Sequence, residues 1–203
     1  MKRMIGFVSV ALILSGCATA RLSKGPESFA LTQHPNAVNV GVAKVVDERT
    51  SANVGTIGAA GIRVKQADLS DITTNYLVNS LNTELKTNVT RIVSINNENA
   101  ATVAGSTAAD VFLATHIKRV KIFSADALMQ PVEVNIDMEL TVYDKAGKTI
   151  YTAPISGTYE KRIGISIVDK ATGQLVESTV QDAVNNLIKD SGFRKAIGLS
   201  VNQ

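Results

Sequence analysis

Residues 132–143, VEVNIDMELTVY, alternate apolar and polar side chains without a break. Successive side chains of a β-strand point to opposite faces, so this period of two predicts a strand with one face on the core and the other in water. One-sided strands are typical of antiparallel sheets, whereas strands of all-parallel sheets are buried on both faces. The stretch therefore predicts a mainly antiparallel sheet that is covered on one face.

Neighbouring segments extend this sheet. Residues 144–148, DKAGK, predict a hairpin loop after the alternating strand. Further strands are predicted at 37–47, 90–95, 109–123 and 149–162. The 109–123 strand has two phases of alternation, and a β-bulge near Lys118 and Arg119 reconciles them.

Two segments carry apolar residues at helical spacing. They are residues 68–88, where Asp68 or Ser70 is expected to cap the first turn, and residues 175–190. The polar stretch 96–109 between the strands has no clear period and is expected to be a loop or a frayed turn. We therefore expect a single α+β domain in which both amphipathic helices pack on one face of a mainly antiparallel sheet.

The N-terminus has the order of a secretory signal peptide. Lys2 and Arg3 precede an apolar run that ends at Leu14, and this run is shorter than the about 20 residues that a membrane-spanning helix needs. The following LSGC, residues 14–17, resembles the lipobox of bacterial lipoproteins, which implies cleavage between Gly16 and Cys17 and attachment of diacylglyceryl and N-acyl lipid, such as palmitate, to Cys17. Three acyl chains make such an anchor practically permanent.

The predicted organisation follows from this signal. Residues 1–16 are the lipoprotein signal peptide, residues 17–37 are a lipidated N-terminus and flexible tether, and residues 38–203 are a single periplasmic α+β domain. Ala18, and not aspartate, follows the cysteine, which by analogy with lipoprotein sorting predicts the periplasmic face of the outer membrane. A free buried thiol, or a leftover thiol in an ordinary cleaved signal peptide, is the alternative for Cys17.

Composition narrows the function further. The signal peptide holds two of the 21 Lys and Arg residues and none of the 18 Asp and Glu residues, so the mature chain has 19 basic against 18 acidic residues. This balance predicts no binding of nucleic acid, which needs a basic surface. Because Cys17 is the only cysteine, the fold is held without disulfides, by a core of valine, isoleucine, leucine and alanine. The absence of tryptophan argues weakly against a carbohydrate-binding groove.

Residues 48–66, ERTSANVGTIGAAGIRVKQ, break every periodic pattern and are expected to form a long loop. Their glycines match neither a P-loop nor a dinucleotide fingerprint, so close contact with another protein chain is the expected role. An ion pair between Asp47 and Arg49 is expected to close the preceding strand. The candidate partner-binding residues are Asp47, Arg49, Gly55, Gly58 and Gly61.

Nothing in the sequence predicts catalytic residues, a metal site or a cofactor other than the lipid on Cys17. A catalytic thiol needs a nearby base, and the two histidines, His34 and His116, lie in distant segments. His116 also lacks a partner at metal-ligand spacing and is expected to be an ordinary strand residue. The basic run 116–123 is expected to be a solvated strand face, with contact to anionic lipid headgroups as the alternative.

The order of the segments resembles a known family. The lipobox, the polar tether, VNVGVAKVVDERT at residues 38–50, the amphipathic helix, the extended strand pair and the C-terminal helix are similar to the YajG-type uncharacterised bacterial lipoproteins, over about residues 38 to 200. This resemblance implies an outer-membrane lipoprotein and no established activity.

Two functions are therefore expected to compete. The first is a non-enzymatic interaction or accessory subunit that presents residues 48–66, or an exposed strand edge, to a protein partner in the cell envelope. The alternative is a carrier of lipid or small hydrophobic molecules, as in auxiliary lipoproteins of ABC-type envelope transport systems, which needs an apolar cavity between the sheet and the helices. The sequence leaves the oligomeric state open.

Overall fold

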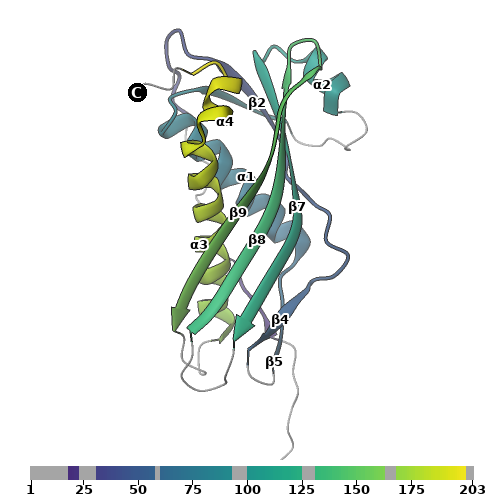
Figure 1. Cartoon of the computed structure of the whole chain (residues 1–203), viewed down its shortest axis with the longest axis vertical. Coiled ribbons are helices and arrows are strands. Elements are labelled where there is room, and N and C mark those ends of the chain that lie inside the picture. Colours follow the sequence, from purple (N-terminus) through teal and green to yellow (C-terminus); the bar gives the residue numbers. More distant parts are fainter. Residues whose placement is uncertain are drawn as a thin grey trace, which may run out of the picture.

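The computed structural model describes residues 18–22, 31–57, 60–92, 100–124, 131–162 and 168–199. They form one α+β domain, an elongated molecule in which the long helices α1 and α3 cover one face of the sheet (Figure 1). The strands are β1 Ala18–Thr19, β2 Asn39–Ala43, β3 Val46–Asp47, β4 Asn53–Ile57, β5 Ala60–Arg63, β6 Asn88–Ile92, β7 Val111–Ser124, β8 Pro131–Asp144 and β9 Thr149–Arg162. The helices are α1 Gln66–Thr83, α2 Ala100–Ser106, α3 Val168–Lys189 and α4 Ser191–Ala196.

Strand β7 organises the sheet. On one side it pairs antiparallel with β8, which pairs antiparallel with β9. On its other side it runs parallel to β2, β3 and β4 in turn along its length. The sheet is therefore mixed, and the prediction of a mainly antiparallel sheet holds only for β7 to β9. Parallel pairing needs a crossover connection, and α1, β6 and α2 provide one between β2–β4 and β7.

The predicted features of β7 and β8 are confirmed. The register between them shifts between Ile117 and Arg119, so Lys118 occupies a β-bulge. Every second residue of β8 is buried, namely Val132, Val134, Ile136, Met138, Leu140 and Val142. This face packs on α3, whose Val180 and Ala183 are fully buried, as the aliphatic composition predicts.

The helices differ from the prediction in their bounds. Helix α1 begins at Gln66, its N-cap residue is Lys65 without a side-chain hydrogen bond, and neither Asp68 nor Ser70 caps it. Helix α3 begins at Val168, earlier than the predicted start at residue 175. None of the helices in the described part of the chain is long and apolar enough to cross a membrane.

Helix α2 lies within the stretch that was expected to be a loop. It packs on the face of the sheet opposite α1 and α3, where Ala100 and Ala104 contact Phe112 and Ala114 of β7. Its seven residues carry neither a charged first turn nor a basic last turn, so the usual sequence signals for helix ends are missing.

The prediction of a long loop over residues 48–66 is wrong. Residues 53–57 and 60–63 of this stretch form the antiparallel pair β4–β5, and β4 joins the sheet where Gly55 pairs with Ile122. Gly55 has φ +146°, and a Cβ on it would overlap the backbone oxygen of Ile122. Glycine, which sequence reasoning took as a loop signal, here allows two strands to approach closely.

The segments expected to be a flexible tether contact the domain where the structure describes them. Ala18 and Thr19 pair with β5, and the Ala20 N–H donates to the Arg63 carbonyl oxygen at 2.8 Å. The side chain of Asn82, at the end of α1, binds both backbone polar groups of Thr32. Its Oδ1 accepts from the Thr32 N–H at 2.9 Å, and its Nδ2 donates to the Thr32 carbonyl oxygen at 2.8 Å. Residues 23–30 lie outside the described part.

Close packing of α3 on β9 generates a stability prediction. A Cβ on Gly157 would lie 2.8 Å from the backbone nitrogen of Ala183 and would overlap the Thr179 carbonyl oxygen. We expect Gly157→Ala to lower the free energy of unfolding by about 1–3 kcal/mol, because the helix must move away from the strand. Urea denaturation of the purified domain measures this.

Gly105 in α2 is the matched control, because a Cβ there would meet no atom closer than 3.8 Å. Gly105→Ala should leave the stability unchanged or raise it by up to about 1 kcal/mol. Equal stability of the two variants would contradict the close helix–strand contact.

Candidate functional site

The predicted ion pair between Asp47 and Arg49 exists and is buried. Their side chains are 2% and 5% exposed. Arg49 Nη2 donates to Asp47 Oδ2 at 2.6 Å, and Nε donates to Oδ1 at 2.9 Å, so the guanidinium binds the carboxylate with two nitrogens. Neither side chain is accessible to a partner protein.

This pair joins three parts of the fold. Asp47 is the last residue of β3, Arg49 Nη2 also donates to the carbonyl oxygen of Val64 after β5 at 3.2 Å, and Gln66 of α1 binds the Arg49 carbonyl oxygen. The ion pair and the backbone of Arg49 therefore link β3 to the end of the β4–β5 hairpin and to the start of α1.

The predicted partner-binding loop is thus part of the sheet. Gly55 faces Ile122, and Gly61 pairs with Thr56 within the hairpin. Gly58 and the predicted lipidation and cleavage residues, Cys17 and Gly16, lie outside the described residues. Of the five candidate residues, the structure brings Asp47 and Arg49 into contact and places Gly55 and Gly61 on neighbouring strands.

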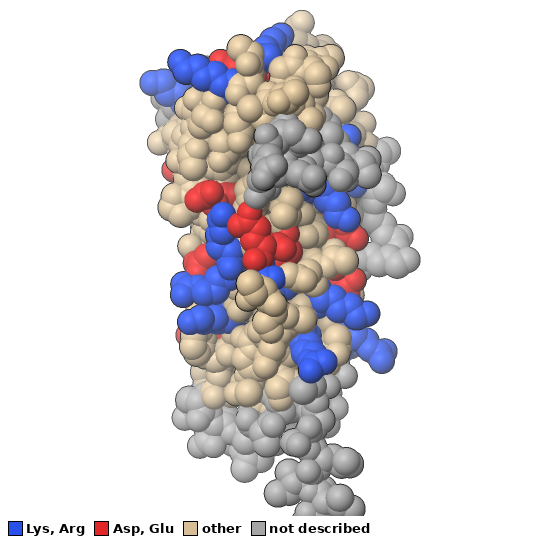
Figure 2. Space-filling model, turned by 90° about the vertical axis from the view of Figure 1, so that its right-hand side faces the viewer, with Lys and Arg blue, Asp and Glu red and all other residues tan. Residues whose placement is uncertain are grey.

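A second cluster of charges lies on the sheet face opposite α1 and α3. Glu48 accepts a hydrogen bond from Lys118 Nζ at 2.7 Å, and its other oxygen is 3.0 Å from His116 Nδ1. Lys118 also lies 3.6 Å from Glu139 of β8. Figure 2 shows acidic side chains gathered at the middle of one face of the molecule with basic side chains around them.

The chemistry of this cluster is that of a cross-strand ion network. The hydrogen bond to Glu48 and the nearby Glu139 raise the pKa of Lys118 above its usual value, so the amine stays charged at neutral pH and cannot serve as a base. Thr115 is next to His116 in β7, but the side chains of adjacent strand residues point to opposite faces of the sheet. Its hydroxyl therefore lies on the face away from this cluster. Within the described residues, no group of three His, Cys, Asp or Glu side chains could hold a metal ion.

The sequence also predicts an exposed strand edge as a partner surface. The free edge of β9 is one such edge, and α3 covers its middle. The Thr158 N–H donates to Asp182 Oδ2 at 3.1 Å, and Asn186 Nδ2 donates to the Ser156 carbonyl oxygen at 3.2 Å. Pro154, two residues before Ser156, lacks an N–H. These groups would have to be displaced before another strand could pair there, so this edge is protected against strand addition.

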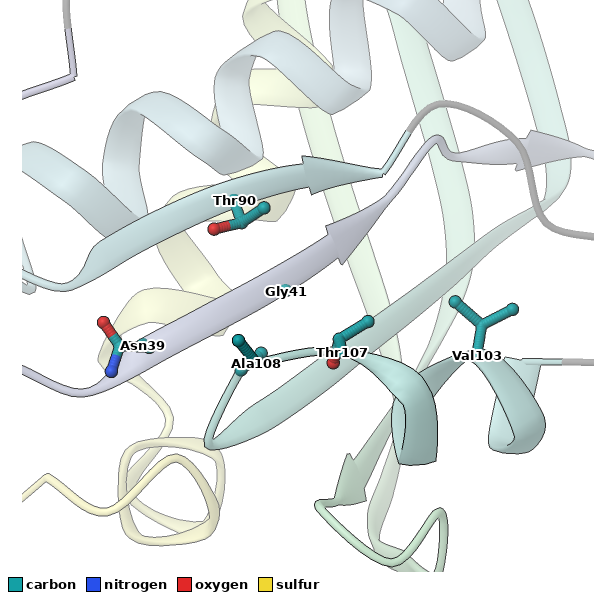
Figure 3. A pocket seen from close by; sticks show the side chains of 7 residues that line it. Asn39, Gly41, Thr90, Val103, Thr107 and Ala108 are labelled. Atoms are coloured by element: carbon teal, nitrogen blue, oxygen red, sulfur yellow. The ribbon is translucent and has the colours of Figure 1, made fainter.

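A cleft of about 530 Å³ opens beside α2, at the end of the sheet where β7 begins. Figure 3 shows Thr90 of β6 on one side of Gly41 of β2, and Thr107 and Ala108, which follow α2, on the other. The lining is small and mixed in polarity: Asn39, Gly41, Thr90, Val103, Thr107, Ala108 and Ala109. Its volume falls in the range of ligand-binding pockets.

Hydrogen bonds fix one corner of this cleft. Asp110 Oδ2 accepts from the backbone and side chain of Asn39 at 2.9 and 3.0 Å, and Lys145 Nζ lies 2.6 Å from Asp110 Oδ1. The hydrogen bond from Lys145, with those from Asn39, holds the pKa of Asp110 below its usual value. The corner therefore stays charged and ordered near neutral pH.

Sequence reasoning missed the cleft. Its residues are short side chains from β2, β6, α2 and the segment after α2, and they carry no motif that marks a site. Only the pairing of β2 with both β6 and β7 brings these segments together.

Solved structures share the fold. Protein XCC0632 from Xanthomonas campestris, described by the family model DUF330, aligns with 85% of this chain and 91% of its own at a TM-score of 0.53 and 13% identity. The PelC dodecamer from Paraburkholderia phytofirmans aligns over 85% and 95% of the two chains (TM-score 0.44, 10% identity). A minor lipoprotein from Acinetobacter baumannii aligns over 79% and 96% (TM-score 0.41, 8% identity).

At these identities the comparison establishes a common fold with XCC0632 and nothing about activity. No protein-family model and no curated protein matches the sequence. The resemblance to YajG-type lipoproteins therefore stays a prediction.

The buried ion pair generates the prediction for this region. Arg49→Met should lower the free energy of unfolding by about 3–5 kcal/mol, because it leaves the Asp47 carboxylate buried without its partner. The double variant Asp47→Leu, Arg49→Met should recover much of this loss. Thermal and urea unfolding of both variants give the comparison.

The exposed pair Lys44–Asp71, whose side chains are 43% and 60% accessible, is the control. Lys44→Met should cost less than about 1 kcal/mol. Similar losses for Lys44→Met and Arg49→Met would show that burial adds nothing to the Asp47–Arg49 pair.

Proposed function

We propose that this protein is a lipid-anchored subunit of the bacterial cell envelope, held at the periplasmic face of the outer membrane by Cys17. It acts without catalysis as an accessory subunit and binds a segment of a protein partner in the cleft beside α2. The lipobox at residues 14–17 supports the anchor, and the cleft is the observation that carries the binding role.

The position of the cleft supports this function. Val40 of β2 pairs with Val111 at the start of β7, while Ala18, next to the predicted anchor, pairs with Ile62 in the β4–β5 hairpin near the end of β7. The two pairing positions on β7, residues 111 and 122, are eleven residues apart, which corresponds to about 35 Å at about 3.3 Å per residue. The cleft therefore lies far from the anchored end of the domain.

The lining of the cleft suits a protein segment better than a lipid. Asn39, Thr90 and Thr107 bring polar groups to a cleft whose remaining residues are small, and this mixture is similar to that of ordinary protein interfaces. A carrier needs a closed apolar cavity under the helices, and at Gly157 the α3–sheet contact leaves no room even for a methyl group. This packing favours the accessory subunit over the carrier.

Lipidation predicts the location. When residues 1–16 are replaced by an ordinary cleavable signal peptide, Cys17→Ser should place the protein in the soluble periplasmic fraction. The intact native protein should have the mass of the chain that begins at Cys17 plus its acyl groups. A protein that stays on the membrane after Cys17→Ser would contradict the lipid anchor.

Partner binding is tested by photo-crosslinking in intact cells. A photoreactive residue at Thr90 or Ala108, on the two sides of the cleft, should give one discrete protein adduct, while one at the exposed Gln174 on α3 should not. Ala108→Arg should abolish the adduct formed at Thr90, with a stability change within about 0.5 kcal/mol because Ala108 is exposed. Phospholipid adducts at Thr90, or equal adducts at Gln174, would reject this role of the cleft.

A further inference from the structure

The residues that follow the predicted lipidation site are fixed to the domain. Ala18 and Thr19 run parallel to β5 opposite Ile62 and Arg63, and Ala20 is 2% exposed. The carbonyl oxygen of the next residue, Arg21, lies directly against Gly173 of α3, where a Cβ would overlap it. Ala18, the residue directly after the predicted lipidation site, is therefore paired with the domain.

The strand registers show where on the domain this point lies. Ala18 pairs with Ile62, which pairs with Gly55, and Gly55 pairs with Ile122 of β7. Across the rest of the sheet, Ile122 pairs with Val134 and Val134 with Tyr159. This row lies two residues before the end of β7, at the lower end of the molecule in Figure 1.

Exposed aromatic side chains are found at this same end. The described residues include three exposed large hydrophobic side chains, and two of them, Phe123 at 51% and Tyr159 at 41%, belong to this row or the next. Phe123 pairs with Glu133, and Tyr159 pairs with the core residue Val134, so the two rings lie on opposite faces of the sheet and flank its end. Tyrosine is enriched at membrane–water interfaces, and phenylalanine occurs on the apolar face of interfacial segments.

Basic side chains accompany the aromatic ones. Lys121 Nζ lies 6.0 Å from the centre of the Phe123 ring. The exposed cations of this end include Arg21, Arg63, Lys121, Lys161, Arg162 and Lys170, while its acidic residues in the described part of the chain are Glu133, Glu160 and Asp169. Figure 2 shows Lys and Arg side chains prevailing on the lower half of the described surface. A cationic surface of this kind is attracted to anionic lipid headgroups.

We propose that this end of the domain, with Phe123 and Tyr159 as its contacts, lies on the headgroups of the membrane that holds the Cys17 anchor. The proposal rests on the lipid anchor of the proposed function. The acyl chains supply the affinity, and the aromatic and basic residues set the orientation of the domain, with the cleft directed away from the membrane. A long flexible tether would allow any orientation, whereas the docked residues 18–22 allow few.

Fluorescence quenching tests this contact on the full lipidated protein. The chain contains no tryptophan, so Phe123→Trp and Tyr159→Trp each introduce a single reporter at an exposed position. The protein is reconstituted into vesicles of phosphatidylethanolamine and phosphatidylglycerol with bromine on the acyl chains. Trp emission at either position should fall to about half of that in unbrominated vesicles, because interfacial side chains reach about 5–10 Å into the headgroup and acyl boundary.

Ile150 gives a matched control. It is the third exposed large hydrophobic residue, at 42%, and lies at the opposite end of β9, nine residues or about 30 Å from Tyr159. Ile150→Trp should show no quenching. Quenching at 150 equal to that at 123 and 159, or none at any of the three, would overturn the proposed orientation.

Flotation of the same samples separates this proposal from the proposed function. Protein that floats with the vesicles and carries the acyl mass, but shows no selective quenching at 123 and 159, retains its anchor and rejects the membrane-facing end. Protein that neither carries the acyl mass nor floats rejects the anchor, and the orientation with it.

Discussion

Strand β7 is the constraint on which the rest of the structure depends. Its fourteen residues pair along their whole length with β8, and they receive β2, β3 and β4 one after another on the other side. The bulge at Lys118 makes this possible, because the buried positions change phase there, from Ile117 to Val120. Without the extra residue, one half of the strand would turn its apolar side chains to solvent.

Pairing of β3 with β7 also explains why Asp47 and Arg49, at the end of this pairing, are buried although they are charged. The Asp47–Arg49 pair holds β3, the β4–β5 hairpin and α1 together at the point where the pairing of β3 with β7 ends. Sequence reasoning identified the pair from its spacing but treated it as a surface feature. Its burial depends on Val64 and Gln66, which follow the hairpin, and no local pattern indicates that the hairpin folds back over the pair.

The parts of the fold that sequence predicts well are those with a local period. The alternation of residues 132–143, the bulge near Lys118 and the stripes of α1 and α3 follow from side chains a few residues apart. The β4–β5 hairpin, α2 and the cleft depend on contacts between distant segments, as when Gly55 lies against Ile122. Glycine there signals a close approach of strands as readily as a loop, so composition alone misled the prediction.

The domain has two distinct ends. The aromatic and basic end lies beside the first residues after Cys17, and the cleft beside α2 lies at the start of β7. Helix α3 covers the middle of the β9 edge, and the ion pair is buried, so neither this stretch of the edge nor the side chains of Asp47 and Arg49 are left for a partner. An accessory subunit built this way would be fixed at one end and would hold its partner at the other.

Hydrogen exchange of the Ala20 amide in the lipidated protein tests most directly whether residues 18–22 are docked on the domain. Because this N–H donates to the Arg63 carbonyl oxygen and Ala20 itself is 2% exposed, it should exchange at least about a hundredfold more slowly than in an unfolded chain. Exchange at the rate of an unfolded chain would show a free tether and would remove the link between the anchor and one end of the domain.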